Sequence, residues 1–302
     1  MDKQNYRRAL GCIAPLFSIC VAQLSAAQVV TFELAGQETV QQRLAQYKGN
    51  DSKRELALKQ MFMDVGCTGD QLSEQAVPKK KQPNVLCVLS GTTADVILVG
   101  GHFDHVNNGE GVADNWSGAS LLPSLYQALA NKPREHTFVF IGFTGEEDGL
   151  LGSEFYVSHL SAEQLGKIEL MVNLDTLGLG PTKVWVKQSD PVMLSRLAKV
   201  AAATRLPVTS AEIGSLGESD EEPFIARKVC TLVVHSLTSK TLPVLHSALD
   251  NQHSIQFPEY YDTYRLLAAF LARADEPSVP QRHACAAEPV EMYRRAHHLA
   301  AP

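Results

Sequence analysis

Apolar, β-branched runs alternate with segments of helical spacing along this sequence, and this alternation restricts the fold more than any other feature. The runs predict strands at residues 95–101, 137–142, 168–174, 183–187 and 230–234. Helical patterns cover residues 29–65, 117–130, 151–160, 191–204 and 258–273. Strands that are apolar on both faces are typical of sheets covered by helices on both sides. We therefore expect an α/β fold in a single domain, with three layers, α/β/α, around a mixed and mostly parallel central sheet.

Residues 1–27 have the pattern of an export signal. Basic residues precede an apolar run at residues 9–21, and Ser25-Ala26-Ala27 supplies the small residues that signal peptidase prefers. The apolar run is shorter than the roughly 20 residues that a membrane-spanning helix needs. We therefore expect a periplasmic or secreted protein, with one domain over residues 28–275, a polar tail over residues 276–302 and no membrane span.

Four cysteines follow the predicted signal, at positions 67, 87, 230 and 285. Cysteines in an exported chain favour disulfides, and three pairings of four are possible. Cys67 with Cys87 is the preferred local pair, since it closes a polar loop that contains Lys79, Lys80 and Lys81. Free buried thiols are the alternative.

The overall charge excludes one broad class of partner. The formal net charge is −6 at pH 7. Because nucleic-acid binding depends on neutralising phosphates with basic side chains, an acidic chain is a poor nucleic-acid binder.

Carboxylates and imidazoles gather where the predicted strands end. The first strand leads into His102 and Asp104, the second into Glu146 and Glu147, and the third into Asp175. Two loops add Asp114 and His246. Since ligands bind beyond the carboxyl ends of the strands in such sheets, we expect these side chains to share one cleft.

These residue types together point to a metal site. Carboxylates held close together raise each other's pKa unless a cation neutralises them, and a divalent metal does so. Two histidines and three acids, listed as His102, Asp114, Glu147, Asp175 and His246, offer mixed nitrogen and oxygen ligation suited to zinc, with one carboxylate bridging if there are two ions. Asp104 could accept a hydrogen bond from the second ring nitrogen of His102. Taken singly, each residue also fits an ordinary role as a helix cap, a solvated turn or a surface histidine.

Other reactive residues lack a comparable setting. Six histidines lie in polar segments without a matching partner, at positions 136, 159, 253, 283, 297 and 298, while His105 and His235 lie closer to the predicted cleft. The sequence contains no Gly-x-Ser-x-Gly, no phosphate-binding Gly-x-x-x-x-Gly-Lys and no His-Glu-x-x-His.

Several segments resemble the M28 family of zinc peptidases over residues 40–273. They are Gly101-His-Phe-Asp104, Ala113-Asp-Asn-Trp-Ser-Gly118, Phe143-Thr-Gly-Glu-Glu-Asp-Gly-Leu-Leu-Gly-Ser153, Asn173-Leu-Asp175 and Leu245-His-Ser247. The resemblance implies a catalytic domain with two Zn²⁺ ions in which Asp114 bridges. It implies His102 and Asp175 as the further ligands of one ion, and Glu147 and His246 as those of the other. It also implies Glu146 as the general base and a cis peptide bond between Asp114 and Asn115.

The sequence departs from the family pattern at two positions. Trp116 stands where Ala is common, and it could narrow the pocket beside the bridging ligand. Glu221, in Ser219-Asp-Glu-Glu-Pro-Phe224, stands where His is common, which puts the substrate pocket in doubt. Some members use a tyrosine to stabilise the oxyanion, and no tyrosine lies between Arg205 and Asp250.

The resemblance implies an aminopeptidase acting on peptides with a free N-terminus. A glutaminyl cyclase is the nearest alternative, since it shares the fold with a single zinc that Asp114, Glu147 and His246 would bind. A non-catalytic module that retains the fold is a third alternative. The oligomeric state is left open.

Overall fold

The computed structural model describes residues 32–47, 49–211 and 219–276. The expected export signal, Cys285 and the tail beyond Glu276 lie outside the described residues. Among the described residues, no helix has both the length and the apolar character needed to cross a membrane.

The described residues form an eight-stranded mixed sheet with the order β1-β2-β4-β3-β5-β8-β6-β7. The strands are β1 (Leu72–Gln75), β2 (Asn84–Leu89), β3 (Val96–His102), β4 (Thr137–Phe143), β5 (Ile168–Leu174), β6 (Lys183–Val184), β7 (Thr209–Ser210) and β8 (Thr231–His235). The four central strands β4, β3, β5 and β8 are parallel, while β1 and β2 pair antiparallel at one edge and β6 pairs antiparallel with β8. The carboxyl ends of the four parallel strands therefore lie at one edge of the sheet.

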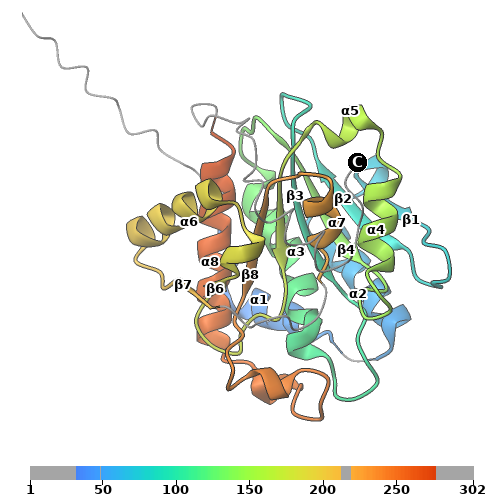
Figure 1. The fold of residues 1–302 in the computed structure, drawn as a ribbon, viewed down its shortest axis with the longest axis vertical. Helices are drawn as coiled ribbons and strands as arrows, with labels where there is room; N and C mark the ends of the chain where they lie inside the picture. Colours follow the sequence, from blue (N-terminus) through green and yellow to red (C-terminus); the bar gives the residue numbers. More distant parts are fainter. Residues whose placement is uncertain (1–31, 48, 212–218, 277–302) are drawn as a thin grey trace, which may run out of the picture.

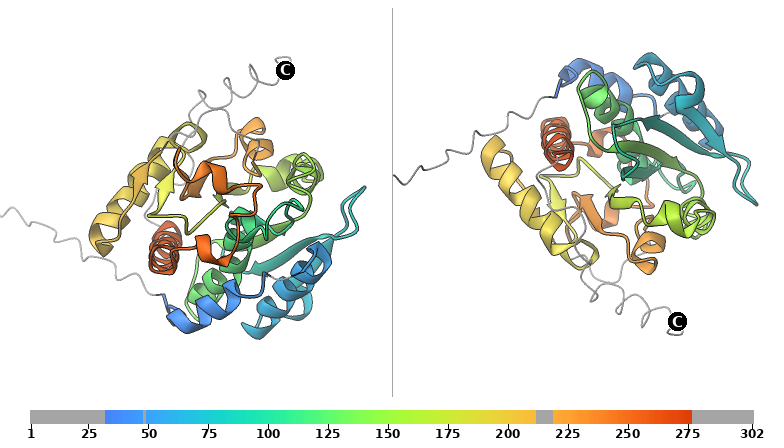
Figure 2. Two further views of the ribbon diagram at one scale, coloured as in Figure 1. Left: turned by 90° about the horizontal axis from the view of Figure 1, so that it is seen from below. Right: turned by 90° about the horizontal axis from the view of Figure 1, so that it is seen from above.

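Helices cover both faces of this sheet (Figures 1 and 2). They are α1 (Gln37–Leu44), α2 (Asp51–Asp64), α3 (Ser117–Ala130), α4 (Leu151–Ser158), α5 (Ala162–Leu165), α6 (Pro191–Thr204), α7 (Glu222–Ala226) and α8 (Phe257–Ala274). α3 packs on β3 and β4 and is flanked by α1, α2 and α8, while α6 packs against α8. α4 and α7 pack together on the opposite face. The predicted three-layer fold is confirmed.

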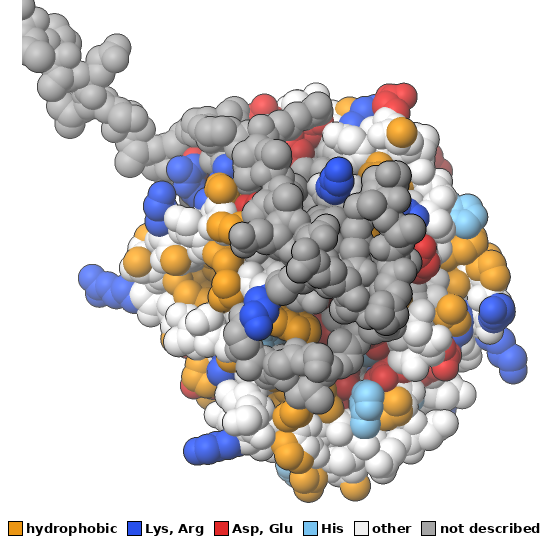
Figure 3. Space-filling model, viewed as in Figure 1, with side chains coloured by type: hydrophobic (Ala, Val, Ile, Leu, Met, Phe, Trp, Pro, Cys, Tyr) orange, Lys and Arg blue, Asp and Glu red, His pale blue; other side chains and the backbone are white. Residues whose placement is uncertain are grey.

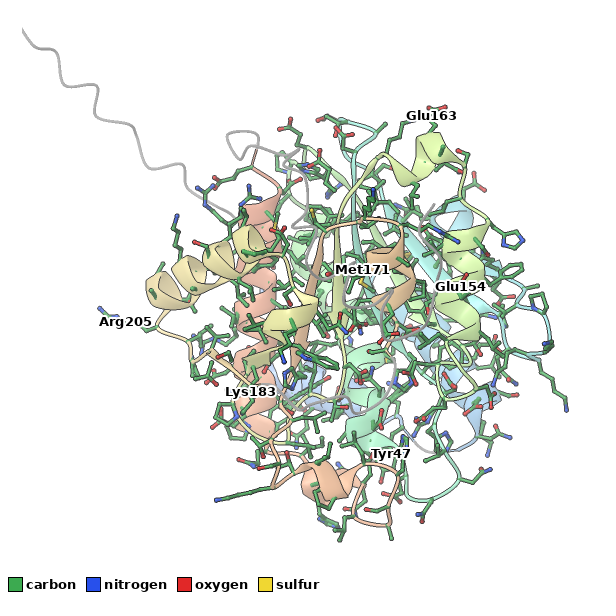
Figure 4. The ribbon with its side chains drawn as sticks, viewed as in Figure 1. Tyr47, Glu154, Glu163, Met171, Lys183 and Arg205 are labelled. Carbon is green, nitrogen blue, oxygen red and sulfur yellow. A yellow bond between two sulfur atoms is a disulfide. The ribbon has the colours of Figure 1, made fainter. Side chains whose placement is uncertain are left out.

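Alternating side chains of the central strands feed two separate cores, as the two-residue period of a strand requires. Ile97, Val99, Phe138 and Phe140 belong to the core under α1, α2, α3 and α8. Their sequence neighbours Leu98, Val139 and Ile141 belong to the core under α4 and α7, as does Met171 of β5. Met171 lies near the centre of the molecule in Figure 4. Burial on both faces explains why these strands are continuous apolar runs in the sequence.

Two predicted elements are wrong in extent. The strand expected at residues 183–187 is reduced to the two residues of β6, because the chain turns away at Val186–Gln188 and enters α6. The helical pattern at residues 29–65 forms two helices, α1 and α2, which are separated near Gly49. Gly49 has a φ of 115°, and Asn50 caps α2 by accepting a hydrogen bond from the Lys53 N–H at 3.2 Å.

The preferred local disulfide is confirmed, since Cys67 and Cys87 are bonded. Cys87 lies in β2, the second strand from the edge of the sheet, and Cys67 follows α2, so the bond joins this strand to the end of that helix. Cys230 is also disulfide-bonded.

Figure 3 shows one face of the molecule with its charged side chains. Lys and Arg side chains of the described residues are spread over this face among acidic and neutral groups.

Candidate metal centre

The parallel strands bring the predicted site residues to one edge of the sheet. His102 is the last residue of β3 and lies opposite Phe143 of β4. Glu146 and Glu147 follow β4, and Asp175 follows β5. Side chains that are far apart in the sequence, such as those of His102 and Asp175, therefore meet because of strand register.

Asp114 reaches the same place from the turn Val112–Trp116 between β3 and α3. The side chain of the next residue, Asn115, donates to the carbonyl of Leu174 at 2.8 Å and accepts from the Gly118 N–H at 2.9 Å. A Cβ atom on Gly118 would lie 2.3 Å from the Leu174 carbonyl oxygen, so this close approach needs glycine. The turn is thus fastened to the end of β5, and the Asp114–Asn115 peptide bond is cis, as the resemblance implied.

The Asp114 carboxylate lies between two imidazoles. Its Oδ1 is 3.4 Å from His102 Nε2, and its Oδ2 is 3.2 Å from His246 Nε2. On the outer side, His246 Nε2 is 3.0 Å from Glu147 Oε2, and His102 Nε2 is 3.8 Å from Asp175 Oδ1. All five predicted metal ligands therefore come together in two groups that share Asp114. We refer to these five residues as the candidate ligand cluster.

Glu146 faces the same cluster from the His102 side. Its Oε2 lies 3.8 Å from His102 Nε2. The donor atoms of His102, Glu146 and Asp175 lie within 4.8 Å of one another, as do those of His102, Asp114 and Glu147. The position of Glu146 therefore suits either a proton acceptor beside a bound ion or a ligand of that ion.

The pKa values within the cluster reflect an excess of buried carboxylates. Burial raises the pKa of Glu147 to about 7 and also raises the pKa of Asp175. Burial would lower the pKa of His102, but the neighbouring carboxylates hold it well above its ordinary value. The hydrogen bond with Asp114 raises the pKa of His246 to about 9. The carboxylates cannot all ionise without added positive charge, which bound divalent cations would supply.

Two buried side-chain atoms in the cluster are also placed to bind a cation. Within the part of the chain that the structure describes, His102 Nε2 and Glu147 Oε1 are shielded from solvent and have no hydrogen-bond partner. Buried polar atoms are normally paired, so atoms of this kind that converge on one point are typical of metal ligands. The donor set fits zinc.

Asp104 differs in detail from its predicted role. The nearest acceptor for His102 Nδ1 is the main-chain oxygen of Asp104 at 3.2 Å, whereas the Asp104 carboxylate is 3.7 Å away. That carboxylate instead accepts the main-chain N–H groups of Glu146 at 3.2 Å and Glu147 at 3.3 Å. Asp104 therefore orients the two adjacent glutamates as well as the histidine.

Trp116 does not narrow the pocket, and that expectation is wrong. Its side chain is fully buried in the core, and the indole N–H donates to the main-chain oxygen of Arg43 at 3.3 Å. The guanidinium of Arg54 lies 5.7 Å from the indole ring centroid. Arg54 is itself fully buried and donates to the main-chain oxygens of Tyr47, Phe103 and Glu110. The turn directs Trp116 away from Asp114, into the layer of helices.

Glu221 is also buried rather than exposed to a substrate. Its Oε2 accepts from Asn173 Nδ2 at 2.7 Å, and burial raises its pKa to about 7. Two residues before it, Ser219 donates to Asp175 Oδ2 at 2.8 Å, a contact that the sequence analysis missed. The segment thus supports the strand end and Asp175 from behind.

A cavity of about 480 Å³ opens beside the cluster. Its polar side is formed by Asp114, Glu146, Glu147, Asp175 and His246, and its apolar side by Trp185, Val233, Leu237, Leu242 and Leu245. His235 also lines it, and burial lowers the pKa of that imidazole to about 4. His235 is therefore neutral at physiological pH.

The remaining histidines in the described residues lie outside this cavity. His105 pairs with Asp51 at 3.0 Å. His136, which was expected to lack a partner, lies between Asp275 at 3.1 Å and Glu169 at 3.3 Å, at the start of β4. His136 therefore has a structural setting that sequence spacing did not suggest.

Comparison with known proteins gives one family match. A model described as Peptidase family M28 matches residues 84–271, more than half of the chain. Aminopeptidase YwaD of Bacillus subtilis is 29% identical over 186 residues, which make up 59% of this chain and 38% of that protein. The chain thus spans well under half the length of this curated relative.

Two solved structures share the fold. A structure described as BSAP, a zinc aminopeptidase from Bacillus subtilis, matches with a TM-score of 0.60 and 24% identity, covering 68% of this chain and 52% of that chain. A glutaminyl cyclase from an Acidobacteriales bacterium matches with a TM-score of 0.66 and 20% identity, covering 84% of this chain and 99% of that chain.

Proposed function

Because the chain belongs to peptidase family M28, we propose that it is a zinc-dependent aminopeptidase that hydrolyses the N-terminal peptide bond of peptides. The observation that carries this proposal is the Asp114 carboxylate, which lies within 3.4 Å of His102 on one side and 3.2 Å of His246 on the other. A carboxylate between two imidazoles, each beside a further acid, is the arrangement expected for two ions that share one bridging ligand.

In this proposal the cluster divides into two metal positions. His102 and Asp175 would hold one Zn²⁺ ion, Glu147 and His246 would hold the other, and Asp114 would be shared. Zinc bound there would polarise the scissile carbonyl and make the attacking water more acidic.

Glu146 is the general base. It accepts the proton of the attacking water and returns it to the leaving amine. Asp104 holds Glu146 in place through the main-chain N–H at 3.2 Å.

The cavity suggests which peptides are hydrolysed. Its apolar side is formed by residues such as Trp185, Leu237 and Leu245, and its other side is acidic. An apolar N-terminal side chain would bury its surface against these residues, while the acidic side would favour the positively charged α-amino group. We therefore propose substrates with a free N-terminus and a large apolar first residue.

A panel of aminoacyl anilides tests this function. Leucine anilide should be hydrolysed faster than the alanine, glutamate or lysine anilides, and an N-acetylated leucine anilide should not be hydrolysed. A metal chelator should abolish the activity, and added zinc should restore it. Hydrolysis that is insensitive to the chelator would exclude the proposal.

A glutaminyl cyclase is the second candidate, favoured by the fold match that spans 99% of that cyclase chain. It would use one zinc held by Asp114, Glu147 and His246, with Glu146 moving the proton. N-terminal glutamine peptides separate the two functions, because a cyclase releases ammonia and leaves the peptide at full length. Zinc stoichiometry gives an independent answer, one ion for the cyclase and two for the aminopeptidase.

We also propose that the protein acts after export, in the periplasm or outside the cell. The disulfide between Cys67 and Cys87 supports an oxidising compartment. Mass spectrometry of the secreted or periplasmic protein would test this by locating its N-terminus, which is expected near residue 28.

A further inference from the structure

One buried carboxylate outside the candidate ligand cluster contacts the turn that carries Asp114. The side chain of Asp250 has Oδ1 2.9 Å from the Val112 nitrogen and 2.7 Å from the Ala113 nitrogen, and Oδ2 3.1 Å from the Asp114 nitrogen. Asp250 is 1% exposed. A single carboxylate therefore accepts three consecutive main-chain N–H groups that end at the bridging residue.

Asp250 also belongs to the loop that carries His246. Its main-chain oxygen accepts the Glu110 N–H at 2.7 Å, and the Asn108 side chain donates to the main-chain oxygen of His246 at 2.7 Å. A Cβ atom on Gly109 would lie 2.2 Å from the Ser247 oxygen, so the two loops are in direct contact. The positions of Asp114 and His246 are thus fixed relative to each other by contacts between these loops.

The other side of the cluster is held in a different way. His102 lies in β3 and Asp175 directly follows β5, and these strands pair with each other in the sheet. Their separation is set by main-chain register, which does not involve Asp250. Asp114 belongs to both halves, but Asn115 fastens its turn to the carbonyl of Leu174 at the end of β5, so its position beside His102 and Asp175 does not depend on Asp250 alone.

We propose that Asp250 is the positioning residue for the metal site at His246, and that it sets the distance between Asp114 and His246. This inference rests on the proposed function, because it concerns the ion that Asp114, Glu147 and His246 would hold. Removing the carboxylate should weaken binding at that site more than at the site of His102 and Asp175, because the shared ligand Asp114 is still held to the end of β5 by Asn115.

Replacement of Asp250 by Asn tests the inference, with titration of zinc into the metal-free protein as the measurement. The amide cannot accept all three N–H groups, because one of its two terminal atoms is a donor. We expect the zinc at His246 to bind with at least tenfold weaker affinity and the zinc at His102 to be affected by a clearly smaller factor. The control is Asp275→Asn, since Asp275 also accepts main-chain N–H groups, from Glu135 and His136, but far from the cluster. This control should lower the melting temperature and leave both zinc affinities unchanged.

Equal weakening of both zinc sites in Asp250→Asn, or wild-type affinity at both, would overturn the inference. If Asp250→Asn does not fold, the same zinc titration is carried out on Asn108→Ala, which removes only the contact with the His246 main chain. Selective weakening of one site by Asn108→Ala supports the inference, and unchanged binding at both sites overturns it. Zinc stoichiometry and anilide hydrolysis of the wild-type protein test the proposed function separately, so the two failures are distinguishable.

Discussion

Exchange of Glu146 for Gln keeps the shape of the side chain and removes its ability to accept a proton. Glu146 Oε2 lies 3.8 Å from His102 Nε2, which suits both a general base and a metal ligand. Under the proposed function, the variant keeps both zinc ions because the candidate ligand cluster is unchanged. If Glu146 is instead a metal ligand, the variant loses the ion beside His102.

The size of the expected effect follows from the loss of proton transfer. General-base catalysis typically contributes a factor of about 10² to 10⁴ in rate. At about 1.4 kcal/mol per factor of ten, the activation barrier should rise by roughly 3–5 kcal/mol. The KM should change little, because the apolar side of the cavity is untouched.

Two matched variants make this result specific. Glu147→Gln alters the adjacent carboxylate, which lies 3.0 Å from His246 Nε2, and should lower zinc content as well as activity. Glu163→Gln alters a glutamate at the outer edge of the molecule and should behave as wild type (Figure 4). Steady-state kinetics on leucine anilide and zinc content after dialysis provide both readouts. The reasoning is refuted if Glu146→Gln retains near-wild-type kcat, or if it loses zinc while Glu147→Gln does not.

Three further predictions concern stability. Replacing Cys67 and Cys87 together by Ser removes a cross-link with a sequence separation of 20 residues. The loop-entropy relation predicts that the free energy of unfolding, measured in urea, falls by about 3 kcal/mol, and a fall below about 1 kcal/mol would contradict it. Burial would lower the pKa of His136, but the hydrogen bond to Asp275 and the charge of Glu169 hold it above 6.5. Protonated His136 therefore stabilises the folded protein fully below pH 6.5, and this contribution is lost as pH rises through the folded-state pKa. His136→Asn should therefore lower the melting temperature more at pH 6 than at pH 9, and an equal decrease at both would exclude this linkage. Arg54→Met leaves three main-chain oxygens without their donor and should destabilise the protein by about 3 kcal/mol or more in the same urea assay, whereas a loss under 1 kcal/mol would show that water replaces the guanidinium.

The buried strands could be predicted from the sequence, and the edge strands could not. β3, β4 and β5 lie under helices on both faces and are therefore apolar at almost every position. β1 is polar and largely exposed, and β6 and β7 have two residues each, so no periodic pattern marks them. The short apolar run of β2 directly follows a lysine-rich loop, so the pattern does not distinguish it from the end of that loop.

The positions of the candidate ligands followed from strand ends, whereas the residues that support them did not. His102, Glu147 and Asp175 come directly at or after buried strands, so topology alone brings them together. Asp250 contacts Asp114 across 136 residues of sequence, and no local pattern distinguishes it from a solvated loop aspartate. Trp116 is near Asp114 in sequence, which suggests a place in the pocket, but the turn between them directs the two side chains to opposite sides. Sequence distance is a poor guide wherever the chain reverses direction.

The contacts of Arg54 have a consequence for where this protein could be truncated. The region of family similarity begins at residue 84, after Arg54 and after Cys67. Yet Arg54 donates to the main-chain oxygen of Phe103, the residue that follows His102, and to that of Glu110 in the next loop. A fragment trimmed to the similar region would therefore lack a group that holds the loop beside the candidate ligand cluster. The smallest unit expected to fold autonomously begins before α2, and boundaries for expression should be drawn from these buried contacts rather than from the extent of shared sequence.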